Sequence, residues 1–350
     1  MPHNRIVAED MQFITGMALP WERLAGKAVL ITGANGFLPA YMVGALLFLN
    51  KNKGLGINII GLVRNKAKAM QRFGHEVDSG QVMLIVQDVS MPLTVDGPVD
   101  YIVHAASQAS PKYYGVDPAG TLKANVLGTY NLLEIAREKK TEGFLFFSSG
   151  EVYGELQSDN DKIKEDSYGI VDPMIVRSCY AESKRMGETM CVSWHHQFGV
   201  PAKVVRAFHT YGPGMDLDDG RVHADFVSDV LARRDIVMRS EGAFVRAFCY
   251  LSDATTGFFT VMLKGENGEA YNIGNDTCEI SIRDLAAKIA GLYPELGMRV
   301  VQQVTERPEG YIESKFRRSC PNTDKARGLG WEPRFSIEDG FKRTIESYQI

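Results

Sequence analysis

A continuous apolar run followed at once by two closely spaced glycines constrains this chain more than any other stretch. Residues 27–32 (Lys-Ala-Val-Leu-Ile-Thr) have the uninterrupted hydrophobicity of a parallel strand that is buried on both faces. Gly33 and Gly36 follow, and residues 37–47 have the pattern of an amphipathic helix. A strand, a glycine turn and a helix in this order predict a dinucleotide-binding unit, because the glycines let the backbone approach a pyrophosphate at the helix N-terminus.

The same segment also fits a plain glycine turn between two structural elements. A third glycine is expected at position 39 of a dinucleotide-binding turn, and the chain has Pro39 there. Proline is tolerated early in a helix, but close packing of the helix on the strand must then be achieved in another way. If the turn binds a dinucleotide, the expected contacts are Gly33, Asn35, Gly36, Phe37 and Leu38.

Strands and helices alternate along the first 207 residues. We predict further strands at 58–63, 82–86, 99–104, 144–148 and 202–207, and helices at 118–139 and 180–196. Right-handed crossovers between such elements give an α/β fold, here a Rossmann-type doubly wound parallel sheet, whose ligands bind at the carboxyl ends of the strands. In the helix at 118–139, the residues expected on the apolar side are Leu122, Val126, Tyr130, Leu133 and Ile135.

The alternation decays after residue 207, which indicates a second, smaller lobe. We expect a lead-in at 1–26, to which we assign no chemistry, and an NAD(P)-binding domain at 27–207 together with about 247–275. Residues 208–246 and 276–350 are expected to form a smaller C-terminal substrate-binding lobe. The chain has no internal repeats and no low-complexity linker, so this lobe should fold together with the sheet.

Residues at the predicted strand ends are candidates for contacts to the rest of a dinucleotide. Arg64 follows the second strand, where an acidic residue would bind the ribose of NAD and an arginine can pair with the 2′-phosphate of NADP. Arg64 therefore favours NADP, although an arginine can also stack on adenine. Asp88, after the third strand, can accept from the adenine amino group or simply cap a loop. The remaining candidates are Val89, Ala105, Ala106, Ser107 and Asn125.

Tyr180 and Lys184 stand four residues apart and so lie on one face of a helix, about one turn apart. An ammonium beside a phenol favours the phenolate, so Lys184 is expected to lower the pKa of Tyr180 from its ordinary value of about 10. The spacing also occurs by chance in many helices, with the tyrosine packed and the lysine solvated. Because the predicted strand ends also carry Ser107, Ser149 and Glu151, we favour the catalytic interpretation.

Composition excludes several classes of function. The net charge of −4 leaves no basic footprint, so nucleic acid is not an expected partner. The five cysteines are scattered without a Cys-x-x-Cys pair, which predicts reduced thiols and no metal site. No run reaches the roughly 18 apolar residues of a membrane span, and the first residues lack the apolar core of a signal peptide. We expect a cytoplasmic protein that does not bind membranes.

Many ordered motifs together resemble the extended short-chain dehydrogenases/reductases of the nucleotide-sugar epimerase, dehydratase and decarboxylase group, over about residues 27–345. The matching motifs are Thr32-Gly-x-x-Gly36, His104-x-Ala-Ser107, Leu122-Lys-x-Asn125-x-x-Gly128-Thr129, Ser149-x-Glu-Val-Tyr-Gly154, Tyr180-x-x-x-Lys184, Tyr211-Gly-Pro213, Arg246-x-Phe248, Tyr271-Asn-x-Gly274 and Leu329-Gly-Trp331. The nearest likeness within the group is to UDP-glucuronate decarboxylases. It is carried by Ser107-x-Ala-Ser-Pro111, Arg177-x-Cys-Tyr180, Glu188-Thr-Met-Cys191, Asp219-Gly-Arg-Val222 and Arg246-Ala-Phe248.

The resemblance implies a role for each residue of the catalytic centre. Ser149, Tyr180 and Lys184 would form the redox triad, in which Tyr180 takes the proton of the sugar 4-hydroxyl while hydride leaves C4 for the nicotinamide. Glu151 would be the second acid/base, at C5, unless it is an ordinary surface glutamate. Arg221 would lie near the C6 carboxylate, and an ordinary loop arginine is the alternative.

The resemblance also implies the substrate contacts. Arg246 and Arg318 would pair with the pyrophosphate, because the arginine fork suits phosphate. Ser110 and Gly150 are further candidates, but Gly150 stands where decarboxylases have Ser and 4,6-dehydratases have Asp. His209 replaces a phosphate-contacting Asn and could instead be structural. Gly214 likewise replaces an Arg that is common in decarboxylases.

Decarboxylation of UDP-glucuronate through a 4-keto intermediate is therefore the leading functional hypothesis. NDP-hexose 4,6-dehydration and epimerisation at C4 or C5 remain alternatives, and a non-catalytic NAD(P)-binding regulator is a distant one. The resemblance favours NAD, a UDP-sugar substrate and synthesis of polysaccharide or glycoconjugate precursors. It also implies a homodimer that pairs helices at about 118–138 and 180–197 into a four-helix bundle.

Overall fold

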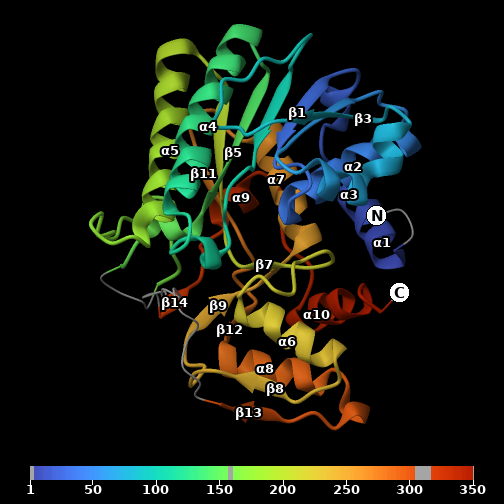
Figure 1. The fold of residues 1–350 in the computed structure, drawn as a ribbon, viewed down its shortest axis with the longest axis vertical. Helices are drawn as coiled ribbons and strands as arrows, with labels where there is room; N and C mark the ends of the chain where they lie inside the picture. Colours follow the sequence, from blue (N-terminus) through green and yellow to red (C-terminus); the bar gives the residue numbers. More distant parts are fainter. Residues whose placement is uncertain (1–3, 157–160, 304–316, 350) are drawn as a thin grey trace.

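The central element is a seven-stranded, wholly parallel sheet, which confirms the expected fold class (Figure 1). The computed structural model describes residues 4–156, 161–303 and 317–349. The strand order is β11-β6-β5-β4-β1-β2-β3. The strands are β1 (Ala28–Thr32), β2 (Asn58–Val63), β3 (Val82–Val86), β4 (Tyr101–His104), β5 (Gly143–Ser149), β6 (Ala202–Ala207) and β11 (Ala270–Ile273). The predicted fourth strand is two residues too long at its start, because pairing with β1 begins only at Tyr101.

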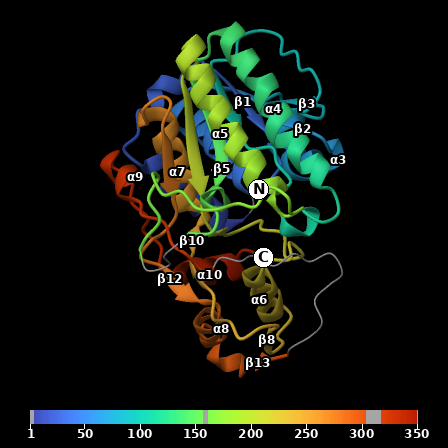
Figure 2. The same cartoon turned by 90° about the vertical axis from the view of Figure 1, so that its left-hand side faces the viewer.

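Helices cover both faces of this sheet, which is why β1 is buried at all five positions. The helices are α1 (Arg5–Gly16), α2 (Phe37–Lys53), α3 (Lys66–Asp78), α4 (Pro118–Lys139), α5 (Ser178–Phe198), α6 (Val222–Leu231), α7 (Leu251–Lys264), α8 (Ile282–Gly291), α9 (Asp324–Gly328) and α10 (Ile337–Glu346). One hydrophobic core lies between the sheet and α2 and α7, and another lies between the sheet and α4 and α5. Figure 2 shows α4 and α5 side by side in front of the sheet.

A smaller lobe lies beyond the carboxyl ends of the central strands (Figures 1 and 2). Its core is formed by α6, α8 and α10 with short strands. These strands are β7 (Thr210–Tyr211), β8 (Ile236–Met238), β9 (Val245–Ala247), β10 (Cys249–Tyr250), β12 (Glu279–Ser281), β13 (Val300–Gln302) and β14 (Arg318–Ser319). The sheet β12-β9-β14 and the pair β13-β8 complete this lobe.

The first helix ties the two ends of the chain together. Helix α1 packs on α2 and α7, and the carboxylate of Asp10 is fully buried there. Tyr41 and Tyr250 donate their hydroxyls to Asp10 Oδ2 at 2.9 and 2.8 Å, and Arg343 Nη2 donates to Oδ1 at 2.8 Å. The lead-in to which we assign no chemistry is thus anchored to the C-terminal helix.

One predicted helix face is partly wrong. Leu122 and Tyr130 of α4 are 40% and 48% exposed, although both were expected on the apolar side. Small and polar residues such as Ala124, Asn125 and Gly128 form the buried face instead, because α4 packs closely against α5 and the sheet. The exposed apolar side chains therefore lie on the outer surface of α4.

Candidate active site

The glycine turn after β1 brings two strand ends into close backbone contact. Gly33 has a φ of +64°, and a Cβ atom there would lie 3.0 Å from the Cα of Ala106. A Cβ at Gly36 would lie 3.0 Å from the Gly33 carbonyl oxygen. The hydroxyl of Thr32 accepts from the amides of Ala105 and Ala106 at 3.2 and 3.1 Å, which fixes the turn after β4 against it. A side chain at Gly33 would be strained by its positive φ, and one at Gly36 would require the turn to shift by a few tenths of an ångström.

A residue that the sequence did not single out braces the glycine turn from outside. Arg72 of α3 donates Nη1 to the carbonyls of Asn35 and Gly36 at 3.1 and 3.0 Å. Its Nη2 donates to the carbonyl of Gly214 at 3.3 Å, which links the turn to the small lobe. Pro39 is buried within the first turn of α2, in place of the third glycine. The sequence held no signal for Arg72, because only the packing of α3 brings it to the turn.

Several buried polar atoms along the strand ends have no hydrogen-bond partner among the described residues. They include Oγ of Ser107, after β4, and Oδ1 of Asn125 in the neighbouring helix α4. Nδ2 of Asn125 donates to the Ser183 hydroxyl at 2.9 Å, and this hydroxyl donates to the Tyr180 carbonyl at 3.0 Å. Since buried polar groups rarely lack a partner, these atoms, together with the glycine turn, fit a bound dinucleotide.

Arg64 and Asp88 face each other at the ends of β2 and β3. Arg64 Nη1 lies 3.8 Å from Asp88 Oδ2, and both side chains are substantially exposed. Burial raises the pKa of Asp88, but hydrogen bonds from Ser90 and the charges of Arg64 and Lys123 outweigh it and hold the pKa below its ordinary value. Val89, the next residue, is buried. Arg64, which was expected to favour NADP, thus has the acidic residue Asp88 as a neighbour.

Tyr180 and Lys184 lie in the first turns of α5 and are only 7% and 2% exposed. The Lys184 ammonium lies 5.8 Å from the centroid of the Tyr180 ring and donates to the Phe147 carbonyl at 2.6 Å. Burial raises the pKa of Tyr180 to about 12, although a hydrogen bond with Ser149 and the charge of Arg221 oppose it. Burial lowers the pKa of Lys184 to about 7. The expected lowering of the Tyr180 pKa is therefore wrong for this structure, because desolvation dominates.

A second tyrosine, which the sequence analysis missed, packs on the first. The rings of Tyr114 and Tyr180 are stacked with centroids 5.0 Å apart and an angle of 18° between their planes. The Tyr114 hydroxyl donates to the Ala109 carbonyl at 3.1 Å. Tyr114 follows the short 3-10 helix Pro111–Tyr113 and is close in sequence to Ser110, a predicted site residue. This closeness is the sequence signal that could have identified Tyr114.

Glu151 is paired with an arginine from the next element. It lies in the 3-10 helix Gly150–Tyr153 directly after β5, and its amide donates to the Ser149 hydroxyl at 3.3 Å. Arg177, which caps α5, donates Nη1 to Glu151 Oε2 at 2.8 Å and Nη2 to Oε1 at 3.3 Å. The structure therefore brings Ser149, Glu151 and Tyr180 together, as the sequence predicted, and adds Arg177.

Arg221 and Ser110 meet where the small lobe touches the turn after β4. Arg221 Nη1 lies 3.0 Å from Asp219 Oδ2, and its Nη2 donates to the Ala109 carbonyl at 2.9 Å. The Ser110 hydroxyl donates to the Asp219 carbonyl at 2.8 Å. Both predicted site residues thus fasten the loop before α6 to the segment that carries Tyr114.

Gly150 faces the ring of Phe208, which is the residue that precedes His209 in the sequence. A Cβ at Gly150 would lie 3.1 Å from the Phe208 ring, so a larger residue there requires this ring to shift by a few tenths of an ångström. His209 Nδ1 and His223 Nε2 are buried without a partner among the described residues. Burial and the charges of Arg246, His223 and Arg221 hold the pKa of His209 well below its ordinary value.

Arg246 and Arg318 lie on neighbouring strands, β9 and β14, where Ser319 is paired with Arg246. Arg246 Nη1 donates to the Val245 carbonyl at 2.8 Å. Arg318 forms a two-point ion pair with Glu279, with Nη2 2.9 Å from Oε2 and Nε on Oε1. The two arginines thus lie on adjacent strands one position out of register, and the Arg318 guanidinium is bound to an acidic residue.

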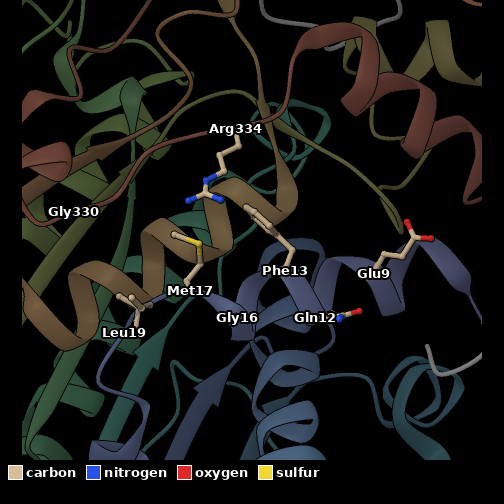
Figure 3. Close-up of a pocket in the computed structure, with 9 residues that line it drawn as sticks. Glu9, Gln12, Phe13, Gly16, Met17, Leu19, Gly330 and Arg334 are labelled. Carbon is tan, nitrogen blue, oxygen red and sulfur yellow. The ribbon is translucent and has the colours of Figure 1, made fainter.

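The cysteines, the acidic and histidine side chains, the helices and one groove are further candidates for functional features. All five cysteines are buried free thiols, and the described part of the chain contains no cluster of His, Cys, Asp or Glu that could hold a metal. None of the helices in the described ranges is both long and apolar enough to cross a membrane. A groove of about 650 Å³ lies away from the candidate site, between α1 and the segment around Arg334 (Figure 3). The guanidinium of Arg334 lies over the Phe13 ring in this groove.

A doubly wound sheet with a glycine turn after β1 and a Tyr-x-x-x-Lys helix after β5 is the architecture of the extended short-chain dehydrogenases/reductases. The chain belongs to the NAD-dependent epimerase/dehydratase family, whose model matches residues 29–274. It is 33% identical over 324 residues to UDP-glucuronic acid decarboxylase 6 of Arabidopsis thaliana, covering 92% of this chain and 89% of the relative. UDP-glucuronic acid decarboxylase 1 of Danio rerio is also 33% identical, covering 92% of this chain and 72% of the relative.

Solved structures agree on the fold. A dTDP-glucose 4,6-dehydratase from Bacillus anthracis in complex with NAD has a TM-score of 0.75 at 21% identity, covering 92% of this chain and 96% of that one. A UDP-glucuronic acid 4-epimerase from Bacillus cereus in complex with UDP-glucuronic acid and NAD has a TM-score of 0.75 at 23% identity, covering 92% and 99%. The expected family and class of enzyme are confirmed, since these relatives are nucleotide-sugar decarboxylases, dehydratases and epimerases.

Proposed function

We propose that this protein is a UDP-glucuronate decarboxylase that works through a 4-keto sugar. The observation that carries the proposal is the convergence of Ser149, Glu151 and Arg221 around Tyr180 near the carboxyl end of β5, in a chain 33% identical to UDP-glucuronic acid decarboxylases over most of its length. Such a set can remove a proton from a hydroxyl, exchange a proton at the neighbouring carbon and attract a carboxylate.

In the first step the phenolate of Tyr180 takes the proton of the sugar 4-hydroxyl. Because burial raises the pKa of Tyr180 to about 12, this step needs the positive charges of protonated Lys184 and of an oxidised nicotinamide beside the phenol. The glycine turn and the strand ends would hold NAD, which would supply the hydride acceptor for C4 and the hydride donor at the end of the cycle. Ser149, which is hydrogen-bonded with Tyr180, orients the reacting oxygen. Burial lowers the pKa of Lys184 to about 7, and the protonated form of this lysine supplies positive charge beside the ring of Tyr180.

The 4-keto group then makes the C6 carboxylate that of a β-keto acid. The electron pair of the C5–C6 bond moves into the C4 carbonyl as carbon dioxide leaves, and C5 takes up a proton. Glu151 is the acid/base for this proton, and Arg221 holds the carboxylate before it leaves. A side chain that performs general acid–base catalysis typically contributes about 10²- to 10⁴-fold in rate.

We further propose NAD rather than NADP as the cofactor. The family is NAD-dependent, and Asp88 lies 3.8 Å from Arg64. Its carboxylate compensates the arginine charge and repels a 2′-phosphate. Arg64 then stacks on the adenine or remains solvated, in keeping with its exposure.

The nucleotide diphosphate of a UDP-sugar is the proposed ligand of the small lobe. Arg246 contributes charge, and His209 and His223 are neutral imidazoles, each with one buried nitrogen that lacks a partner among the described residues. A phosphoryl oxygen can accept from such groups. Arg318 contributes less charge to phosphate binding, because its guanidinium is already paired with the Glu279 carboxylate.

A homodimer through α4 and α5 completes the proposal. Exposed apolar side chains on these two helices include Leu122, Leu127, Tyr130, Met186 and Val192. Large exposed apolar side chains on two helices that pack together favour a protein interface there. Sedimentation should give twice the monomer mass, and Leu127→Arg should give a monomer.

We also infer a cytoplasmic protein without nucleic-acid or membrane partners, acting in synthesis of polysaccharide or glycoconjugate precursors.

Gly150 supports one competing reaction. A serine in this place would supply a hydrogen bond for decarboxylation, and an aspartate would supply the proton donor for 4,6-dehydration. Gly150 supplies neither group, so epimerisation at C4 or C5, which needs neither, is the second candidate. A non-catalytic regulator is disfavoured because Tyr180, Lys184 and Glu151 are all retained.

The deciding experiment incubates the purified protein with NAD, and separately with NADP, against a panel of nucleotide sugars. We expect UDP-glucuronate to lose the mass of carbon dioxide and to give a UDP-pentose, with NAD preferred. Loss of water from a hexose would instead establish dehydration, and an isomer of unchanged mass would establish an epimerase. Absence of any reaction across the panel would contradict the enzymatic proposal for these sugars.

A further inference from the structure

One side chain holds both carboxylate oxygens of Glu151. Arg177 Nη1 donates to Oε2 at 2.8 Å and Nη2 donates to Oε1 at 3.3 Å. The two side chains are 14% and 26% exposed, so the pair is largely shielded from solvent. Two parallel hydrogen bonds from a planar guanidinium fix the plane of a carboxylate as well as its place, whereas a lysine ammonium acts as a point charge.

The pair joins the two elements that carry the proposed chemistry. Glu151 lies just after β5, and Arg177 precedes Tyr180 by three residues at the start of α5. The Arg177 guanidinium also lies 5.9 Å from the centroid of the Tyr114 ring, which stacks on Tyr180. Arg177 therefore sets the position of Glu151 relative to Tyr180, and thus relative to a sugar bound between them.

We propose that Arg177 is a positioning residue for proton transfer at C5 of the sugar and that it acts through Glu151. This inference rests on the proposed function. After carbon dioxide leaves, the enolate carbon C5 takes a proton from the Glu151 carboxyl, its electron pair forms the new C5–H bond, and the C4 carbonyl is restored. Glu151 then takes up a proton from the solvent, which restores its carboxyl group for the next turnover.

The need for such a device follows from geometry. A glutamate side chain has three rotatable bonds, and a displacement of about 1 Å at a reacting group can cost about 10²-fold in rate. Oxidation at C4 depends on Tyr180 and Lys184 and does not require Glu151. Loss of the arginine fork should therefore slow the C5 step selectively, whereas a merely structural role of Arg177 would affect both steps.

The test uses Arg177→Lys, which keeps the charge and removes the fork. With UDP-glucuronate and NAD, stopped-flow absorbance of the reduced nicotinamide reports oxidation at C4 in the first turnover. Deuterium at C5 of the product, formed in heavy water, and kcat report the later step. We expect kcat to fall about 10²-fold with KM and first-turnover reduction nearly unchanged. Arg137→Lys is the matched control, since Arg137 binds Glu134 through two nitrogens on the exposed face of α4.

A double-mutant cycle with Glu151→Gln decides whether Arg177 acts through Glu151. The loss caused by Arg177→Lys should largely disappear in the Glu151→Gln background, because the group being positioned is already gone. Additive losses, or equal slowing of both steps, would overturn the inference while the proposed function stands. If the wild-type protein reduces no cofactor and converts no sugar, the proposed function fails and the inference falls with it.

A second variant covers the case in which Arg177→Lys does not fold. Glu151→Asp withdraws the carboxylate from the fork by one methylene and leaves the surroundings of Arg177 in place. The same selective loss of the C5 step is expected. An unchanged kcat for Glu151→Asp would overturn the positioning role.

Discussion

Tyr180 is a more strongly desolvated phenol than its sequence motif suggests. Burial raises its pKa to about 12, while the hydrogen bond with Ser149 and the charge of Arg221 only partly oppose this effect. Burial also lowers the pKa of Lys184 to about 7, because desolvation disfavours the ammonium. At this scale the motif identifies the residues, but the surrounding protein sets their protonation.

Replacing Tyr180 with phenylalanine removes one oxygen from the candidate site. Since this oxygen is the proposed proton acceptor, we expect kcat to fall about 10²- to 10⁴-fold with little change in thermal stability. Tyr113→Phe, at a partly exposed neighbour of the stacked tyrosine, is the matched control and should retain full activity. Steady-state turnover of UDP-glucuronate measures both. A Tyr180→Phe protein with wild-type kcat would remove Tyr180 from the chemistry.

At the scale of elements, α5 matters because of how closely it lies on β5. Gly187 faces the sheet three residues after Lys184, and a Cβ there would lie 2.3 Å from the Phe146 ring. The Phe146 ring is fully buried and also lies 4.9 Å from the Lys184 ammonium. The absence of a side chain at Gly187 thus sets the distance between the catalytic helix and the strand.

Gly187→Ala should force α5 away from the sheet. Overpacking of this kind typically costs about 1–3 kcal/mol, and the displacement of Tyr180 and Lys184 should also reduce kcat. Denaturant unfolding and steady-state kinetics measure the two effects. Gly74→Ala in α3, where only Met70 lies within 4 Å at 3.6 Å, should instead leave stability unchanged or raise it by up to about 1 kcal/mol. Equal behaviour of the two variants would contradict this account of α5.

At the scale of the whole molecule, the ends of the chain are joined by a buried polar network. Asp10 in α1 receives hydrogen bonds from Tyr41, Tyr250 and Arg343, which come from three other elements. Burial raises the pKa of Asp10, and the charge and hydrogen bonds of these partners only partly oppose it. The network links the large domain to α10 of the small lobe, and so limits movement of one against the other.

Arg343→Met leaves the Asp10 charge buried without its cation. Breaking a buried pair in this way typically costs about 3–5 kcal/mol in unfolding free energy. The double variant with Asp10→Asn should cost less than the sum of the single variants, because it leaves no uncompensated charge. Arg299→Met is the control, since Arg299 is 79% exposed in its pair with Asp235 and should cost under about 1 kcal/mol. Strictly additive losses at Asp10 and Arg343 would contradict the coupling.

The sequence by itself determined the main catalytic candidates and six of the seven strands of the sheet, all but β11, because these depend on local patterns. Apolar runs define strands such as β1 and β2, and the glycine turn and the Tyr180–Lys184 spacing follow from backbone geometry within a few residues. The carboxyl-edge rule for parallel sheets then brought Ser149 and Glu151 to the same region without any further information.

Only the tertiary structure decided which groups pair across that region. Arg177 with Glu151, Arg72 with the glycine turn and Arg64 with Asp88 are contacts between elements, and no periodicity within one element encodes them. The pKa values of Tyr180 and Lys184 likewise depend on burial by the whole fold. Local backbone preferences are carried by neighbouring residues, whereas desolvation and ion pairing depend on distances that exist only after the chain has folded.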